Sequence, residues 1–214
     1  MIIAENTFDY PSIHGRAIRS SDEYSFVSCS KLACEIGAVE LNEYGMVDLI
    51  LGLEKDDGWS LFPYKTFNPK FQKIIKNYMD KSGRILVSGA FIASDMQSKE
   101  EQRFTSEVLK YAYDAPMDTS SSSTSSLTGC GINFTIPRTL NEKHYAVQSC
   151  DCLRPTDTKH GFPSFAYNEN QHCAGIAYKK NDYRVLALGF PFESVTSAKD
   201  RSTLMTAMLQ FLMK

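Results

Sequence analysis

The sequence predicts a single α/β domain with a mostly parallel β-sheet and helices on both faces. Two observations carry this prediction. Apolar segments of strand length alternate with amphipathic segments of helix length over the first half of the chain, as expected when crossover helices connect parallel strands. The segment Met46 to Leu53, "MVDLILGL", is almost continuously apolar, which is typical of an interior strand covered on both faces. A chain of 214 residues is also long enough to bury a substantial core.

In the first half, helices and strands are expected to alternate, and each helix has a recognisable start or end. Pro11 suits the first helical position, Gly37 suits the end of a short helix, and Ser98 with Glu101 forms a capping-box pattern. The expected helices are 11–20, 31–36, 68–83 and 98–113, and the expected strands are 24–29, 46–53 and a segment beginning at Arg84.

The alternation breaks in the second half. Residues 117–131 form a serine-rich stretch that predicts a surface loop, and residues 132–170 contain short segments that predict a β-rich insertion. A hairpin is expected over 174–190, with its turn at 180–182, and a terminal helix over 198–213.

Composition excludes several classes of function. A net charge of −2 and an isoelectric point near 6.1 give no electrostatic basis for binding nucleic acid or an anionic membrane. No apolar run approaches the roughly 20 residues that a membrane-spanning helix needs. The first residues, "MIIAENTFDYPS", do not resemble a signal peptide, so an export signal would have to lie upstream.

Neither a metal nor a cofactor is expected. The chain has no C-x-x-C spacing, and no G-x-G-x-x-G phosphate-binding pattern follows a strand. The string "CDC" at 150–152 is too tight for the usual spacing of structural metal ligands. The six cysteines permit either free thiols or one or two disulfides, and both remain open: Cys29, Cys34, Cys130, Cys150, Cys152 and Cys173.

Candidate site residues follow from the predicted topology, because ligands of such sheets bind at the carboxyl ends of the strands. The stretch "RILVSGAFIASD" ends a strand with small residues and a polar pair. Ser94 and Asp95 could instead cap the next helix. Cys29 ends another strand, and His14 on the preceding helix could pair with it as a base. The candidates for the cleft are Ser88, Gly89, Phe91, Ser94, Asp95 and Glu193.

Several strings in the chain resemble a known group of proteins. "NTFDYPSIHGRAI", "VDLILGLEKDDG", "RILVSGAFIASDM" and "YRVLALGFPFES" resemble the C-terminal region of xanthan-lyase-like secreted proteins of Bacteroides-type bacteria. That region is similar to class I glutamine-amidotransferase-like domains. The resemblance implies a three-layer, flavodoxin-like fold, a periplasmic or extracellular location, and a chain that is the C-terminal part of a longer protein.

The same resemblance implies that the catalytic groups are absent. Class I amidotransferases place a cysteine in a G-x-C-x-G turn, whereas the matching residues here are 89–93 with Phe91 in the place of the nucleophile. Their late H-P-E string corresponds to "FPFE", which keeps Glu193 but has no histidine. A phenyl ring can neither attack a carbonyl nor transfer a proton.

The leading expectation is therefore a non-catalytic binding or scaffold module of an exported, carbohydrate-associated protein. Its partner would be a carbohydrate or a neighbouring domain of the same protein. The alternative is a hydrolase or amidotransferase-like enzyme that uses Cys29 or a serine of the cleft as nucleophile.

Overall fold

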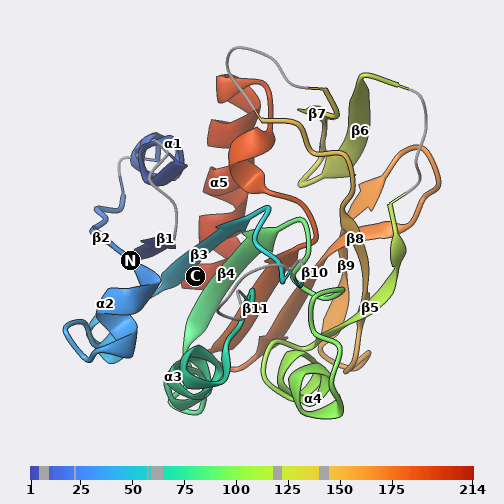
Figure 1. Ribbon diagram of the computed structural model, residues 1–214. Helices are drawn as coiled ribbons and strands as arrows, with labels where there is room; N and C mark the ends of the chain where they lie inside the picture. Colours follow the sequence, from blue (N-terminus) through green and yellow to red (C-terminus); the bar gives the residue numbers. More distant parts are fainter. Residues whose placement is uncertain (5–9, 22, 57, 59–64, 118–121, 140–144) are drawn as a thin grey trace.

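The computed structural model describes residues 1–4, 10–21, 23–56, 58, 65–117, 122–139 and 145–214. Nine strands of the described chain form one sheet (Figure 1). In spatial order they are β2 (Ser28–Cys29), β1 (Ile2–Ala4), β3 (Val47–Gly52), β4 (Arg84–Gly89), β11 (Tyr183–Leu188), β10 (Cys173–Lys180), β9 (Gly161–Tyr167), β6 (Thr124–Gly129) and β7 (Ile132–Pro137). Two further strands, β5 (Tyr111–Pro116) and β8 (Asp151–Pro155), form a separate antiparallel pair.

The large sheet is mixed, which corrects the expectation of a mostly parallel one. The strands from β2 to β11 pair in parallel, whereas β10, β9, β6 and β7 add to them antiparallel. The two-residue turn between β10 and β11 explains the change of direction, because so short a connection can only join antiparallel neighbours. The general α/β class of the prediction is correct.

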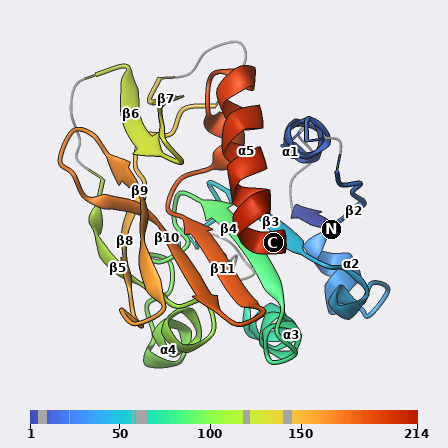
Figure 2. The same cartoon turned by 180° about the vertical axis from the view of Figure 1, so that it is seen from behind.

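Helices cover both faces of the parallel half (Figures 1 and 2). Helices α1 (Tyr10–Arg19) and α5 (Ala198–Met213) pack together on one face. Helices α2 (Lys31–Glu35) and α3 (Pro69–Met79) lie on the other face, where α4 (Lys99–Glu107) packs beside β5. None of the helices in the described part of the chain has both the length and the hydropathy to cross a bilayer.

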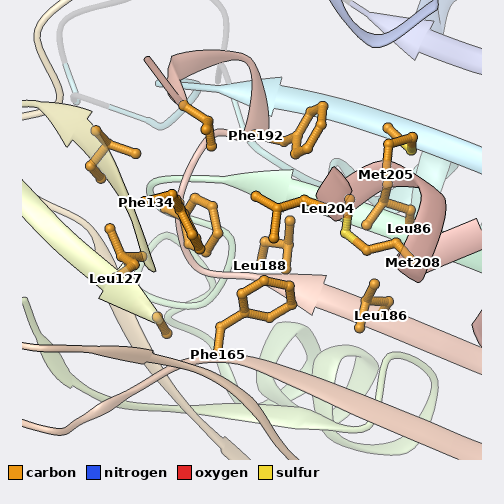
Figure 3. Packing of buried hydrophobic residues seen from close by; sticks show 14 of the residues in the cluster. Leu86, Leu127, Phe134, Phe165, Leu186, Leu188, Phe192, Leu204, Met205 and Met208 are labelled. Carbon is orange, nitrogen blue, oxygen red and sulfur yellow. The ribbon is translucent and has the colours of Figure 1, made fainter. Parts of the chain in front are cut away.

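The helices on each face bury a separate hydrophobic cluster against the sheet. Figure 3 shows α5 inserting Leu204, Met205 and Met208 toward side chains of β4 and β11. These side chains are fully or almost fully buried, and each buried leucine or methionine contributes roughly 1.5–3 kcal/mol. The cluster continues over the antiparallel half through Leu127, Phe134 and Phe165.

The stretch 117–131, expected to be a serine-rich surface loop, contains strand β6. Ser125, Leu127 and Gly129 face inward in alternation and are buried, while their neighbours are more exposed. Small polar residues are compatible with a strand when an alternating apolar face is buried against its partners. The predicted β-rich insertion, 132–170, contains β7, β8 and β9.

The last turns of the predicted helix 98–113 belong to a strand instead. Helix α4 ends at Glu107, and β5 begins at Tyr111. Between them Lys110 has a φ of 66°, a left-handed conformation that interrupts helical geometry.

Candidate functional site

The turn after β4 has a tight main-chain bend, and the residue at the bend is Phe91. An ideal Cβ on Gly89 would lie 2.9 Å from the Cβ of Leu51, so packing against β3 requires a glycine here. The Ala90 amide donates to the Gly52 carbonyl at 2.8 Å, which holds the bend against the end of β3. Phe91 stands at the bend, partly buried, and the Lys55 ammonium lies 4.6 Å from the centre of its ring.

The carboxylate of Asp151 binds the backbone amides of this turn. Its Oδ2 accepts hydrogen bonds from the amides of Ala93 at 2.7 Å and Ser94 at 2.9 Å. Amides in such a turn are the groups that can hold an oxyanion in an enzyme. Burial raises the pKa of Asp151 against the opposing effect of these hydrogen bonds. The Asp151 carboxyl oxygen already occupies the donors that a substrate oxyanion would need.

The backbone of Asp151 also closes the sheet edge. Its amide lies 2.9 Å from the Ala90 carbonyl and 3.1 Å from the Gly189 carbonyl, so the start of β8 bridges the carboxyl ends of β4 and β11. The hydroxyl of Tyr167 lies 3.2 Å from the Asp151 carbonyl, and that of Tyr111 donates to the Ile92 carbonyl at 2.9 Å. Both rings are fully buried at this edge.

Asp95 organises a neighbouring segment and does not cap a helix. Its carboxylate accepts from the amides of Asp56 at 3.0 Å and Thr66 at 2.8 Å, and from the Thr66 hydroxyl at 2.9 Å. The capping alternative for Ser94 and Asp95 is wrong, because α4 begins later and Ser98 is its N-cap. Asp95 thus fixes backbone on both sides of the segment between Asp56 and Thr66.

A second polar cluster is centred on His14 and is buried. The Nδ1 of His14 lies 2.8 Å from Asp48 Oδ2, and its Nε2 lies 3.3 Å from Glu193 Oε2. Tyr145 donates its hydroxyl to the other Glu193 oxygen at 2.9 Å. The ring edge of Phe192, in the short 3₁₀ turn Phe192–Ser194, packs on the imidazole with centroids 4.8 Å apart. His14 and Glu193 therefore meet in space although the sequence offers no histidine near Glu193.

The charge state of His14 follows from these contacts. Burial opposes protonation, but the charges of Asp48 and Glu193 and the hydrogen bonds to them outweigh it and raise the pKa of His14 to about 9. The imidazole is 0% exposed, and a carboxylate oxygen faces each of its ring nitrogens. It is therefore a protonated internal cation at neutral pH and has no free nitrogen with which to accept a proton from a substrate.

Cys29 is not placed beside His14. Its sulfur lies 3.6 Å from the sulfur of Cys34 and 3.8 Å from that of Met1. Burial, followed by the influence of Cys29, raises the pKa of Cys34 to about 12. The Cys34 thiol therefore stays protonated at neutral pH, and it is the thiolate that acts as nucleophile.

A cleft of about 850 Å³ does lie next to the turn after β4, on the side of α4. Of the predicted cleft residues, Ser94 lines it; Ser88, Gly89, Phe91, Asp95 and Glu193 are not among its lining residues. Ser88 is fully buried within β4, and its hydroxyl has no hydrogen-bond partner among the described residues. The cleft is lined by Ala93, Ser94, Met96, Gln97, Lys99, Gln102, Arg103, Thr105, Ser106, Ala112, Tyr113, Arg154 and Thr156.

No protein-family model and no curated protein matches the chain, whereas solved structures do. A β-galactosidase from Rahnella sp. R3 superposes with a TM-score of 0.61 at 11% identity, over 98% of this chain and 30% of that one. The exo-β-1,4-mannosidase Op5Man5 from Opitutaceae bacterium strain TAV5 gives a TM-score of 0.59 at 7% identity, over 100% and 35% of the two chains. A Thermoplasma acidophilum protein described as a GMP synthase subunit gives 0.54 at 11% identity, over 98% and 94%.

The likeness is one of fold. This chain spans about a third of the two glycosidases and nearly the whole of the Thermoplasma acidophilum protein. At such identities the superposition assigns no residue roles.

The sequence reasoning missed Asp151, the residue that closes the edge. The string "CDC" at 150–152 is uninformative as a metal-ligand pattern. Its informative feature is a carboxylate between two cysteines that are both buried, because a buried charge requires hydrogen-bond donors.

Proposed function

We propose that this chain is a non-catalytic binding or scaffold module with a degenerate flavodoxin-like, amidotransferase-like arrangement. It would belong to an exported, carbohydrate-associated, xanthan-lyase-like protein that functions in the periplasm or outside the cell. The observation that carries the absence of catalysis is the Asp151 carboxylate on the amides of Ala93 and Ser94. A substrate oxyanion would have to displace a buried internal ligand before it could bind there.

The other groups that chemistry would need support the same proposal. Phe91 supplies no nucleophile at the bend, and the imidazole nearest to Glu193 is buried between two carboxylates. Covalent catalysis needs a nucleophile within hydrogen-bond reach of a base that can accept its proton. No such pair involves His14 in the described part of the chain.

The proposed carbohydrate association is supported by the kind of protein in which a similar fold is found. Two of the superposed proteins are a β-galactosidase and an exo-β-1,4-mannosidase, and in both the shared fold makes up only about a third of the chain. A fold that forms part of larger sugar-cleaving proteins is compatible with a module that binds or braces rather than cleaves.

A turnover and labelling experiment tests the proposal. The purified chain is incubated with glutamine, to detect ammonia release, and with p-nitrophenyl acetate, to detect ester cleavage. We expect rates equal to those of Cys29→Ala and Ser94→Ala variants. Iodoacetamide labelling near neutral pH, followed by peptide mapping, should modify Cys29 no faster in the folded chain than in the urea-unfolded chain.

Two results would establish the enzyme instead. One is turnover that Cys29→Ala or Ser94→Ala abolishes while the variant still unfolds at the wild-type temperature. The other is labelling of Cys29 many times faster in the folded chain than in the unfolded chain, which would indicate an activated thiolate.

A further inference from the structure

The cleft beside α4 is a defined concave site on the surface. It lies between the turn after β4, the exposed side of α4 and the small β5–β8 sheet, elements that Figure 1 shows next to one another. Its volume of about 850 Å³ falls within the usual range of 300–1,000 Å³ for ligand pockets.

The charge of the cleft is positive and poorly compensated. Lys99, Arg103 and Arg154 line it, and its lining includes no aspartate or glutamate. Arg103 uses its Nε in an exposed bond of 2.7 Å to Glu107. Neither Lys99 nor Arg154 has an ion pair with any residue that the structure describes. In a chain of net charge −2, three cations around one concavity favour an anionic ligand.

These cations act through their side chains rather than through the end of α4. The start of α4 is closed by a capping box, in which the Ser98 hydroxyl accepts from the Glu101 amide and the Glu101 carboxylate accepts from the Ser98 amide. The dipole of a capped nine-residue helix therefore does not define this site.

The walls between the cations suit a hydroxyl-rich ligand. Gln97, Gln102 and Thr156 present amide and hydroxyl groups, and all three are exposed. Tyr113 is 40% exposed and offers a ring on which an apolar face of a sugar can stack. The apolar part of the lining is supplied by Ala93, Ala112, the buried Met96 and the ring of Tyr113.

We infer that this cleft binds an anionic oligosaccharide, with Lys99, Arg103 and Arg154 holding its carboxylate or sulfate groups and Tyr113 stacking on a ring. The inference rests on the proposed binding function and names the ligand class and the site. Binding at exposed side chains is weak and depends on ionic strength.

Calorimetry on the whole chain tests this inference with two probes, tetragalacturonate and a chondroitin sulfate hexasaccharide. They separate carboxylate from sulfate as the recognised group. Fully methyl-esterified tetragalacturonate keeps the sugar shape without the charge. An oligoglutamate of similar charge tests whether an acidic peptide binds as well.

The key variant reverses two charges in the cleft, Lys99→Glu with Arg154→Glu. Its matched control reverses two exposed cations elsewhere, Arg19→Glu with Lys199→Glu, and gives the same net charge. The cleft variant should bind the anionic probe about tenfold more weakly or worse, and the control within about twofold of wild type. Tyr113→Ala should weaken binding about threefold to tenfold. Circular dichroism confirms that each variant is folded.

The outcomes are distinguishable. Binding of at least one anionic sugar, with loss on esterification or desulfation, on addition of 0.5 M salt and in the cleft variant, supports the inference. The inference is overturned if neither anionic sugar binds, or if the neutral ester or oligoglutamate binds with equal affinity. It is also overturned if the control variant weakens binding as much as the cleft variant does. The proposed lack of catalysis is decided separately, by the turnover assays.

Discussion

Raising the pH from about 6.5 to about 8.5 should destabilise the fold through His14. The pKa of this side chain is about 9 in the folded chain and 6.5 in a solvated histidine. At His14 the folded state therefore binds more protons than the unfolded state across this interval, and the contribution of this site to the free energy of unfolding falls as pH rises. The amino terminus acts in the opposite direction, because burial lowers its pKa. One pKa unit is worth about 1.4 kcal/mol, so the contribution is about 3 kcal/mol at the acidic end, of which about 2 kcal/mol is lost by pH 8.5.

Urea unfolding at several pH values measures this loss. The interval ends at about 8.5 because burial also raises the pKa of thiols such as Cys34, and these thiols lower stability at higher pH. Asp48→Asn provides the control, since it keeps the shape of the partner but removes the charge that raises the pKa of His14. Its stability should change much less across the interval. The reasoning is refuted if both chains lose the same free energy, or if magnetic resonance shows His14 titrating near 6.5.

Three further changes have definite expected outcomes. Asp151→Ala should lower the free energy of unfolding by about 2–5 kcal/mol, because the buried Ala93 amide and the partly buried Ser94 amide lose their acceptor, and Asp151→Asn should cost less; a wild-type midpoint in urea for the alanine variant would contradict this. Oxidised glutathione should take two electrons and two protons from the Cys29 and Cys34 thiols, whose sulfurs lie 3.6 Å apart, and so leave a disulfide between them and two molecules of reduced glutathione. Non-reducing peptide mapping detects the bond, a Cys34→Ser chain gives the baseline, and recovery of glutathione adducts alone would speak against it. Lys31→Met should cost about 3–5 kcal/mol in thermal or urea unfolding, since it leaves the buried Glu54 carboxylate without this partner, and adding Glu54→Leu should restore most of the loss; additive losses in the double variant would exclude that account.

The elements that the sequence predicts well are those with a strong local pattern. Helix α5 spans the residues expected for it, 198–213, and β3 lies within its expected range. In both segments the apolar spacing and the flanking residues agree. The sequence pattern predicts helix over the start of β5 because its apolar residues continue the spacing of α4. The two elements are separated by residues 108–110, of which Lys110 is left-handed.

The site could not be predicted to the same extent because its contacts join distant parts of the chain. His14 and Glu193 are 179 positions apart, and Asp151 reaches the amide of Ala93 across 58 positions. No local pattern encodes either contact. The absence of a nucleophile at Phe91 depends on one residue in one turn, and for that reason it is visible from the sequence.

The close contact between β8 and the end of β11 requires a glycine at position 189, because any side chain there would collide with Asp151. A Cβ at this position would lie 2.1 Å from the carbonyl oxygen of Asp151, well inside van der Waals contact. Replacing Gly189 with alanine would thus push the start of β8 away from the end of β11 without altering any charge. Substitution at this position is therefore a way to open the sheet edge that Asp151 closes. A cysteine introduced in the turn after β4 would not be enough, because the amides of Ala93 and Ser94 would still be bonded to Asp151.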